Sequence, residues 1–160
     1  MMTESTHSFT LYQVVFLLPQ PTDVEVLRLL SAETYLVGSG PQVDWLWDKV
    51  RLRHDHVMGD QWKLYGQREV TQTDFGCRVR FHYTLVEHGV DVLRALEFSL
   101  GKPRMCRKQR RLYFDGPDTR LHVDIRDTGP PTLSVETYDE SQRHLVWRDR
   151  LIALGLEEVR

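Results

Sequence analysis

A ten-residue segment near the middle of the chain alternates between two kinds of side chain and constrains the fold more than any other feature. From Gly76 to Leu85, apolar side chains alternate with Arg78, Arg80 and His82. Because successive side chains of a strand point to opposite faces, this period of two predicts a strand with one apolar and one polar face. Such strands are typical of antiparallel sheets.

Similar segments recur along the chain and are separated by turn residues. They are rich in β-branched, aromatic and aliphatic residues, and several end at glycine or proline, as strands commonly do. Connections of hairpin length favour antiparallel pairing over a doubly wound parallel sheet. The expected strands are Phe9–Leu18, Trp45–Arg53, Gln61–Gly66, Gly76–Leu85, Arg104–Phe114, Thr119–Ile125 and Leu133–Tyr138.

Three segments carry helical signals. Thr22 and Glu25 have the spacing of a capping box, which predicts that a helix begins there. Gly89–Leu100 has leucines at helical spacing and is followed by Gly101, and Ser141 begins a last helix. The sequence therefore predicts an α+β fold, with a mainly antiparallel, barrel-like sheet of about seven to eight strands and two to three helices.

Length and composition predict one folded domain. The chain has 160 residues, of which 41% are hydrophobic and 28% charged, as in ordinary globular proteins. We expect a single domain over residues 1–160, with residues 1–8 disordered. The 21 basic and 23 acidic side chains nearly cancel, so the net charge favours neither a nucleic-acid nor a membrane partner.

Two further observations bear on the cellular compartment. Cys77 and Cys106 form no CxxC pair, so we expect reduced, structural cysteines. No apolar run approaches the length that spans a bilayer, and the first residues lack the pattern of a signal peptide. A cytosolic or nuclear protein is the expectation.

Basic side chains recur on the expected strands. Guanidinium groups match phosphate oxygens well, so several that converge inside a barrel would hold a polyphosphate. Two interpretations remain open, because the polar face either faces water or lines a polar lumen. If a tunnel binds phosphate, the residues expected to hold it are Arg51, Arg53, Lys63, Arg78, Arg80, Lys108 and Arg110.

Signals for other chemistry are weak. The chain has no nucleophile elbow, P-loop or GxGxxG motif, so no catalytic residue is expected. His54 and His56 are half of a usual metal site, and we expect neither a metal nor a cofactor. Asp124, Glu136 and Glu140 are carboxylates that could hold magnesium beside a phosphate, although acidic residues near turns are common.

The densest basic run is Arg107–Arg111. An RNA-binding module would need these side chains on one surface, whereas strand alternation divides them between two faces. We therefore expect no direct nucleic-acid binding.

Short strand motifs resemble those of the triphosphate-tunnel enzymes of the CYTH superfamily. The resemblance implies a barrel and a metal-dependent phosphohydrolase activity, or an inactive triphosphate-binding relative. In that family an opening strand supplies Glu-x-Glu-x-Lys, but Phe9–Phe16 here contains no acid and no lysine, which argues against a metal site. The residues that carry the resemblance are Val50–Arg53, Trp62–Gly66, Arg78–Arg80, Lys108–Arg110, Tyr113, Asp124 and Glu136.

Most of the chain also resembles the eighteenth subunit of the Mediator complex, a head-module family with a related barrel. This resemblance implies a nuclear, non-catalytic interaction subunit that forms a heterodimer with the twentieth Mediator subunit and binds a helix of the eighth. Such a subunit would couple transcription regulators indirectly to RNA polymerase II. Trp45, Trp47 and Trp147 are either core or interface residues on this interpretation. The segments that carry this resemblance are Trp62–Glu69, Val79–Val86, Leu96–Gly101, Arg107–Ile125 and Leu133–Glu136.

Overall fold

The structure is a computed structural model, which describes residues 6–20, 23–138 and 141–159. The helices in these ranges are α1 (Val24–Glu33), α2 (Gly89–Leu100) and α3 (Arg143–Ala153). The strands are β1 (Thr6–Leu17), β2 (Tyr35–Leu46), β3 (Arg51–Asp55), β4 (Gln61–Tyr65), β5 (Glu69–Thr73), β6 (Gly76–Leu85), β7 (Arg104–Asp115), β8 (Thr119–Arg126), β9 (Thr132–Thr137) and β10 (Glu157–Val159).

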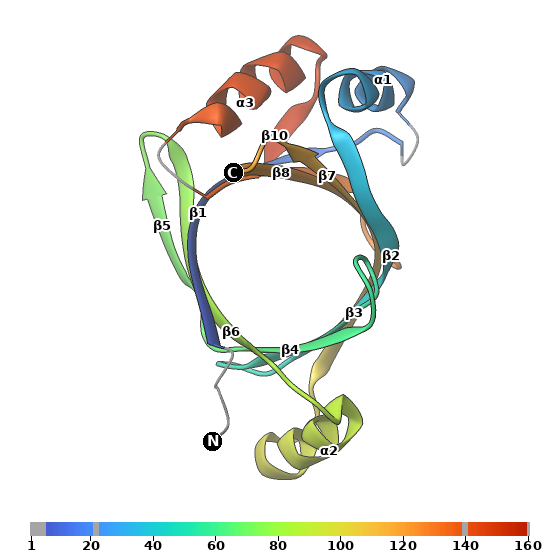
Figure 1. Ribbon diagram of the computed structural model, residues 1–160, viewed down its shortest axis with the longest axis vertical. Coiled ribbons are helices and arrows are strands. Elements are labelled where there is room, and N and C mark those ends of the chain that lie inside the picture. The colour runs from blue at the N-terminus through green and yellow to red at the C-terminus, as the bar shows by residue number, and fades with distance from the viewer. Residues whose placement is uncertain (1–5, 21–22, 139–140, 160) are drawn as a thin grey trace.

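Eight strands close into an antiparallel barrel, seen along its axis in Figure 1. The order around the barrel is β1-β9-β8-β7-β2-β3-β4-β6, and β6 pairs with β1 to close it. The closing pair extends from Thr6 opposite Thr84 to Gln13 opposite Cys77. β5 pairs with β6, and β10 pairs with the end of β1. Closure leaves these eight strands with almost no free edge.

The apolar core lies outside the barrel wall. Helices α1 and α3 cover one side of the barrel, and α2 lies on the opposite side (Figure 1). Phe16 and Leu133 from the wall are fully buried against Leu30 of α1 and Leu151 of α3. Each such side chain stabilises the fold by about 1.5–3 kcal/mol. Because strand side chains alternate, the opposite face of the same strands points into the barrel and is free to be polar.

Several sequence predictions are confirmed. The fold class, the antiparallel pairing and β6 are as expected, with Val79 buried between exposed Arg78 and Arg80. α2 begins and ends as predicted, with Gly101 at a positive φ of 87°. The expected hairpin is the β7–β8 pair, where Asp115 lies opposite Thr119.

The predicted strand Trp45–Arg53 is wrong. This segment is the end of β2, a turn closed by a hydrogen bond from Trp47 N to Val50 O, and β3. The predicted break near Gly38 and Gly40 instead lies within β2. A Cβ on Gly38 would lie 2.1 Å from the carbonyl oxygen of Val57, so these glycines permit a close approach of two backbones rather than end the strand.

Other differences are local. The short strands β5 and β10 were not predicted. Of the residues expected to be disordered, 6–8 are the first residues of β1, while residues 1–5 lie outside the described residues. Thr22 also lies outside them, and the cap of α1 is Asp23, whose side chain accepts a hydrogen bond from Val26 N at 3.0 Å.

The tryptophans divide between core and smaller contacts. Trp147 is 1% exposed and belongs to the core, whereas Trp45 stacks on Trp62. Trp47 donates its indole N–H to the carbonyl oxygen of Gly101. None of the helices described in this structure is long and apolar enough to span a membrane.

Candidate functional site

The barrel lumen is a charged cavity of about 940 Å³. Nine basic side chains and four carboxylates line it in the described part of the chain, so its lining is net positive. The carboxylates are Asp44, Asp124, Asp127 and Glu136. The basic residues are Arg51, Arg53, Arg68, Arg104, Arg107, Lys108, Arg110, Arg120 and Arg126.

Strand alternation places these charges inside the barrel. In β8, Arg120, His122 and Asp124 line the lumen, while Leu121 and Val123 between them enter the outer core. The same period of two brings inward-facing charges from β2, β3, β7 and β9. Of the two alternatives for the polar strand face, the lumen is the one that these strands adopt.

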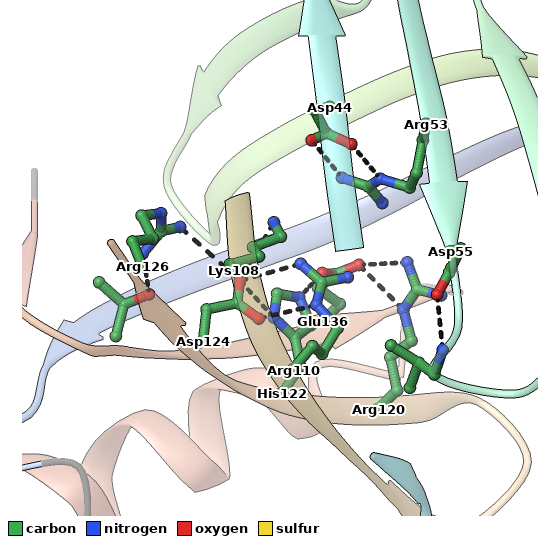
Figure 2. A network of polar contacts seen from close by, with 12 residues as sticks. Asp44, Arg53, Asp55, Lys108, Arg110, Arg120, His122, Asp124, Arg126 and Glu136 are labelled. Carbon is green, nitrogen blue, oxygen red and sulfur yellow. Dashed lines mark hydrogen bonds and ion pairs between the residues drawn. The ribbon is translucent and has the colours of Figure 1, made fainter. Parts of the chain in front are cut away.

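Asp44 of β2 and Arg53 of β3 form a buried, two-pronged ion pair (Figure 2). Arg53 Nε lies 2.7 Å from Asp44 Oδ1, and Arg53 Nη2 lies 2.9 Å from Asp44 Oδ2. Burial alone would raise the pKa of Asp44, but the hydrogen bonds and charge of Arg53 lower this pKa to about 2. The carboxylate is therefore ionised and fully engaged.

Asp124 of β8 forms ion pairs with Lys108, Arg110 and Arg126 (Figure 2). Arg110 donates to both carboxylate oxygens at 2.7 and 2.9 Å, and Lys108 lies 3.4 Å away. Arg126 lies 3.7 Å from the same carboxylate. Burial opposes ionisation of Asp124, but His122 and Arg110 outweigh it and hold the pKa of Asp124 far below its usual range.

Glu136 of β9 is likewise engaged. Arg120 donates two hydrogen bonds to one carboxylate oxygen, at 2.9 and 3.1 Å. His122 contacts the other oxygen through Nε2, while its Nδ1 lies 3.3 Å from Asp124. Burial opposes ionisation, but Arg120 and His122 lower the pKa of Glu136 well below its usual range. His122 thus joins the two carboxylates.

Four lumen arginines have no carboxylate within ion-pair distance among the described residues. Arg68, Arg104 and Arg107 are exposed at the mouth of the cavity. Arg51 is partly buried, and its guanidinium carbon lies 4.2 Å from the ring centroid of Tyr65. Burial and the nearby charge of Arg53 lower the pKa of Arg51 to about 10, so it remains charged at neutral pH. These four cations are available to an anion.

Lys108 is a lumen residue whose charge depends on pH near neutrality. Burial and the charges of Arg110 and Arg53 lower its pKa to about 7, although Asp124 and Asp44 favour its charged form. An anion beside Lys108 would oppose this effect and favour the ammonium.

The wall formed by β1 lacks charge. Its lumen-facing residues are Leu11, Gln13 and Val15, as expected from the absence of acid and lysine in this strand. Asp44, Asp124 and Glu136 are engaged by basic side chains, so these three carboxylates do not fit a divalent metal ion. Glu140, the other carboxylate considered for magnesium, lies outside the described residues.

The structure brings together part of the predicted phosphate-binding set. Arg51, Arg53, Lys108 and Arg110 line the lumen. Lys63 lies 3.5 Å from Asp55 and does not line the main cavity.

Arg78 and Arg80 are exposed on the outer face of β6 and do not belong to the lumen. The apolar face of this strand, with Val79 and Phe81, points inward instead. The prediction that they share a tunnel with Arg51 is therefore wrong.

The sequence analysis missed Arg120, His122 and Arg126. Their signal was an alternation with Leu121, Val123 and Ile125, similar to that in β6. The basic run Arg107–Arg111 divides only in part as expected. Lys108 and Arg110 face the lumen and Arg111 lies beside α1 on the outer side, but Arg107 also lines the cavity.

Comparisons with known proteins identify the fold. No protein-family model and no curated protein matches the chain. Among solved structures, the PH1819 protein of Pyrococcus horikoshii OT3 is 14% identical, with 92% of this chain and 91% of that chain covered and a TM-score of 0.68. A conserved hypothetical protein of Pyrococcus furiosus is also 14% identical, with the same coverage and a TM-score of 0.67.

A third solved structure extends this comparison. HpAC1 from Hippeastrum, described as having a dominant triphosphatase activity, is 13% identical, with 94% of this chain and 89% of that chain covered and a TM-score of 0.61. The chain therefore shares the closed barrel fold of these proteins, which agrees with the tunnel-like barrel expected from the sequence.

Proposed function

We propose that this protein binds a phosphate-rich anion, of the size of inorganic triphosphate or a nucleoside triphosphate, inside the barrel without metal-dependent hydrolysis. The observation that carries the proposal is the unequal pairing of charges in the lumen. Arg53, Arg110 and Arg120 are held by carboxylates, whereas Arg51 and the three arginines at the mouth contact no carboxylate within the described ranges of the chain. Unpaired guanidinium groups that converge on a cavity form strong, charge-assisted bonds with phosphate oxygens.

The paired arginines have a supporting role in this proposal. Their carboxylate partners fix the guanidinium planes and reduce the repulsion among neighbouring cations. The unpaired arginines then bind the anion beside a wall whose side chains are already fixed. Fewer side chains lose conformational entropy on binding as a result.

Hydrolysis is less well supported than binding. Divalent metals speed phosphate transfer by neutralising charge and activating water, and they need free carboxylate oxygens. β1 offers none in the lumen, and Asp44, Asp124 and Glu136 are engaged. Among the described residues, the exposed Asp127 is the one lining carboxylate without a basic partner. The triphosphatase activity described for HpAC1 supports a phosphate-chain ligand, and hydrolysis of that ligand is not part of this proposal.

Calorimetric titration with tripolyphosphate in the presence of EDTA tests the proposal. We expect one anion bound per chain, and about tenfold or greater weakening in Arg51→Ala, because a charge-assisted bond contributes about 1.5–3 kcal/mol. Arg78→Ala is the control, because it removes an arginine side chain from the outer face of β6. This variant should bind tripolyphosphate with the affinity of the unaltered protein. Absence of binding, or equal losses in both variants, would refute the lumen site.

An interaction subunit of the Mediator head is a second candidate. The observation that favours it is the exposed apolar surface of α2, where Phe98 is 94% exposed and Val90 and Leu100 are each 51% exposed. Apolar surface of this kind is common at partner interfaces. Co-expression with the twentieth Mediator subunit should yield a heterodimer with a higher melting temperature. A well-folded monomer whose melting temperature does not change would count against this candidate.

A further inference from the structure

We propose that the end of β3 and the turn that follows it bind one divalent transition-metal ion of the zinc class through His54, His56 and Asp60. This group of residues is called the turn site below. Sequence analysis found half of a metal site in the two histidines, and the fold adds the carboxylate of Asp60. The inference is independent of the proposed anion site.

The three side chains have the spacing of a metal site. One ligand atom from each lies within 4.8 Å of the others. His54 Nε2 is 2.5 Å from Asp60 Oδ1, and His56 Nδ1 is 4.0 Å from the same oxygen. Ligands at about 2.0–2.2 Å from a tetrahedral zinc lie roughly 3.3 Å apart. Small rotations of the exposed Asp60 and His56 side chains would therefore suffice to bind the ion.

The His54 ring is already oriented. It stacks on Trp62 with the ring centroids 4.0 Å apart and the planes at 10°, and Trp62 stacks in turn on Trp45. Groups that fix the orientation of a ligating imidazole favour metal binding.

The backbone of the turn is also held in place. His56 N donates to the carbonyl oxygen of Pro41 at 3.0 Å, and Val57 N donates to Asp55 Oδ1 at 2.9 Å. A Cβ on Gly40 would lie 2.5 Å from the carbonyl oxygen of His56, so the glycine lets β2 lie close to the turn. A turn fixed on both sides presents its ligands at a lower entropic cost than a mobile loop would.

The ligand types select the class of metal. Imidazole favours zinc, copper and nickel, whereas magnesium prefers oxygen ligands. Three protein ligands leave a fourth tetrahedral position for water. Since His54 follows Arg53, which lines the lumen, successive side chains of the strand place the turn site on the outer face of β3.

Metal titration of the full chain tests the inference. The protein is stripped with EDTA, dialysed into buffer free of phosphate and chelators, and titrated calorimetrically with Zn²⁺ and with Mg²⁺. We expect one zinc ion per chain, a raised melting temperature with zinc, and no comparable magnesium binding. Asp60→Asn and His56→Ala should each weaken zinc binding about tenfold or more.

Asp74→Asn is the matched control, because it removes an exposed carboxylate from the β5–β6 turn. Zinc affinity in this variant should equal that of the unaltered protein. Should His56→Ala fail to fold, Asp60→Asn remains decisive, since the Asp60 side chain is 68% exposed. Unaltered zinc affinity in Asp60→Asn would overturn the turn site. Zinc binding abolished by joint replacement of Cys77 and Cys106 with serine would also overturn it.

Discussion

Individual residues in the lumen fall into two groups with different energetic roles. Arg53 is held by Asp44 in a buried pair. Arg51, two positions away on the same strand, faces the ring of Tyr65 and pairs with no carboxylate in the part of the chain that the structure describes. Removing one partner of a buried ion pair leaves the other charge buried without a partner, which destabilises the fold. Removing an unpaired cation mainly weakens the binding of an anion. Stability and binding are therefore separable at neighbouring positions.

The first prediction concerns the paired group. Asp44→Ala should lower the free energy of unfolding by about 3–5 kcal/mol, because Arg53 would remain buried without its carboxylate. Urea denaturation measures this loss. Glu33→Ala is the control, since it breaks an exposed pair with Arg150 and should cost less than about 1 kcal/mol. Equal effects of the two substitutions would contradict the role assigned to Asp44.

Lys108 should make anion binding depend on pH. Its pKa of about 7 in the folded protein lies below the ordinary 10.5, so the lumen gains a positive charge as the pH falls through about 7. Tripolyphosphate should therefore bind more tightly about one unit below this pKa than about one unit above it. Lys108→Arg keeps its charge throughout, so it should show a smaller change. Identical pH profiles for the two proteins would exclude Lys108 as the source.

At the scale of elements, β2 depends on its glycines to approach the β3–β4 turn. Gly38→Ala should destabilise the protein by about 1–3 kcal/mol, because the new methyl group would meet the backbone of Val57. Gly66→Ala is a matched control with no atom within 4 Å of the added carbon. Comparing the melting temperatures of both variants separates this steric effect from the general effect of replacing a glycine with alanine. Comparable losses in both would contradict it.

The neutral wall of β1 leads to a prediction about catalysis. Purified protein with magnesium should release no phosphate from tripolyphosphate or nucleoside triphosphates, because β1 presents Leu11, Gln13 and Val15 rather than carboxylates. A phosphate-release assay checks this. Turnover that persists in Arg78→Ala but is abolished in Arg51→Ala would assign hydrolysis to the lumen and contradict the binding-only proposal.

Elements differ in how far the sequence predicts them. β6 and α2 follow from periodicity and local signals, because those patterns are set within the segment itself. The path of β2 through Gly38 and Gly40 depends on a distant turn and gives the false appearance of a break. Likewise, alternation identifies the two faces of β6, but barrel closure decides which face points inward. Arg78 and Arg80 were therefore assigned to the wrong side.

For the whole molecule, the apolar core and the polar lumen occupy opposite sides of one wall. Core residues under α1 and α3 stabilise the barrel from outside, so its interior can hold charged side chains instead of close-packed apolar ones. This division allows the paired and unpaired cations of the lumen to converge on one cavity. An anion of suitable size is the ligand that such a cavity fits best.

The most direct measurement is a crystal structure of the protein grown with tripolyphosphate in the presence of EDTA. The account predicts density for the phosphate chain inside the barrel, with oxygens in contact with Arg51 and near Lys108. Asp44 should remain paired with Arg53 in that structure. An empty lumen, or an anion bound instead at Arg78 and Arg80 on the outer face, would contradict the central claim.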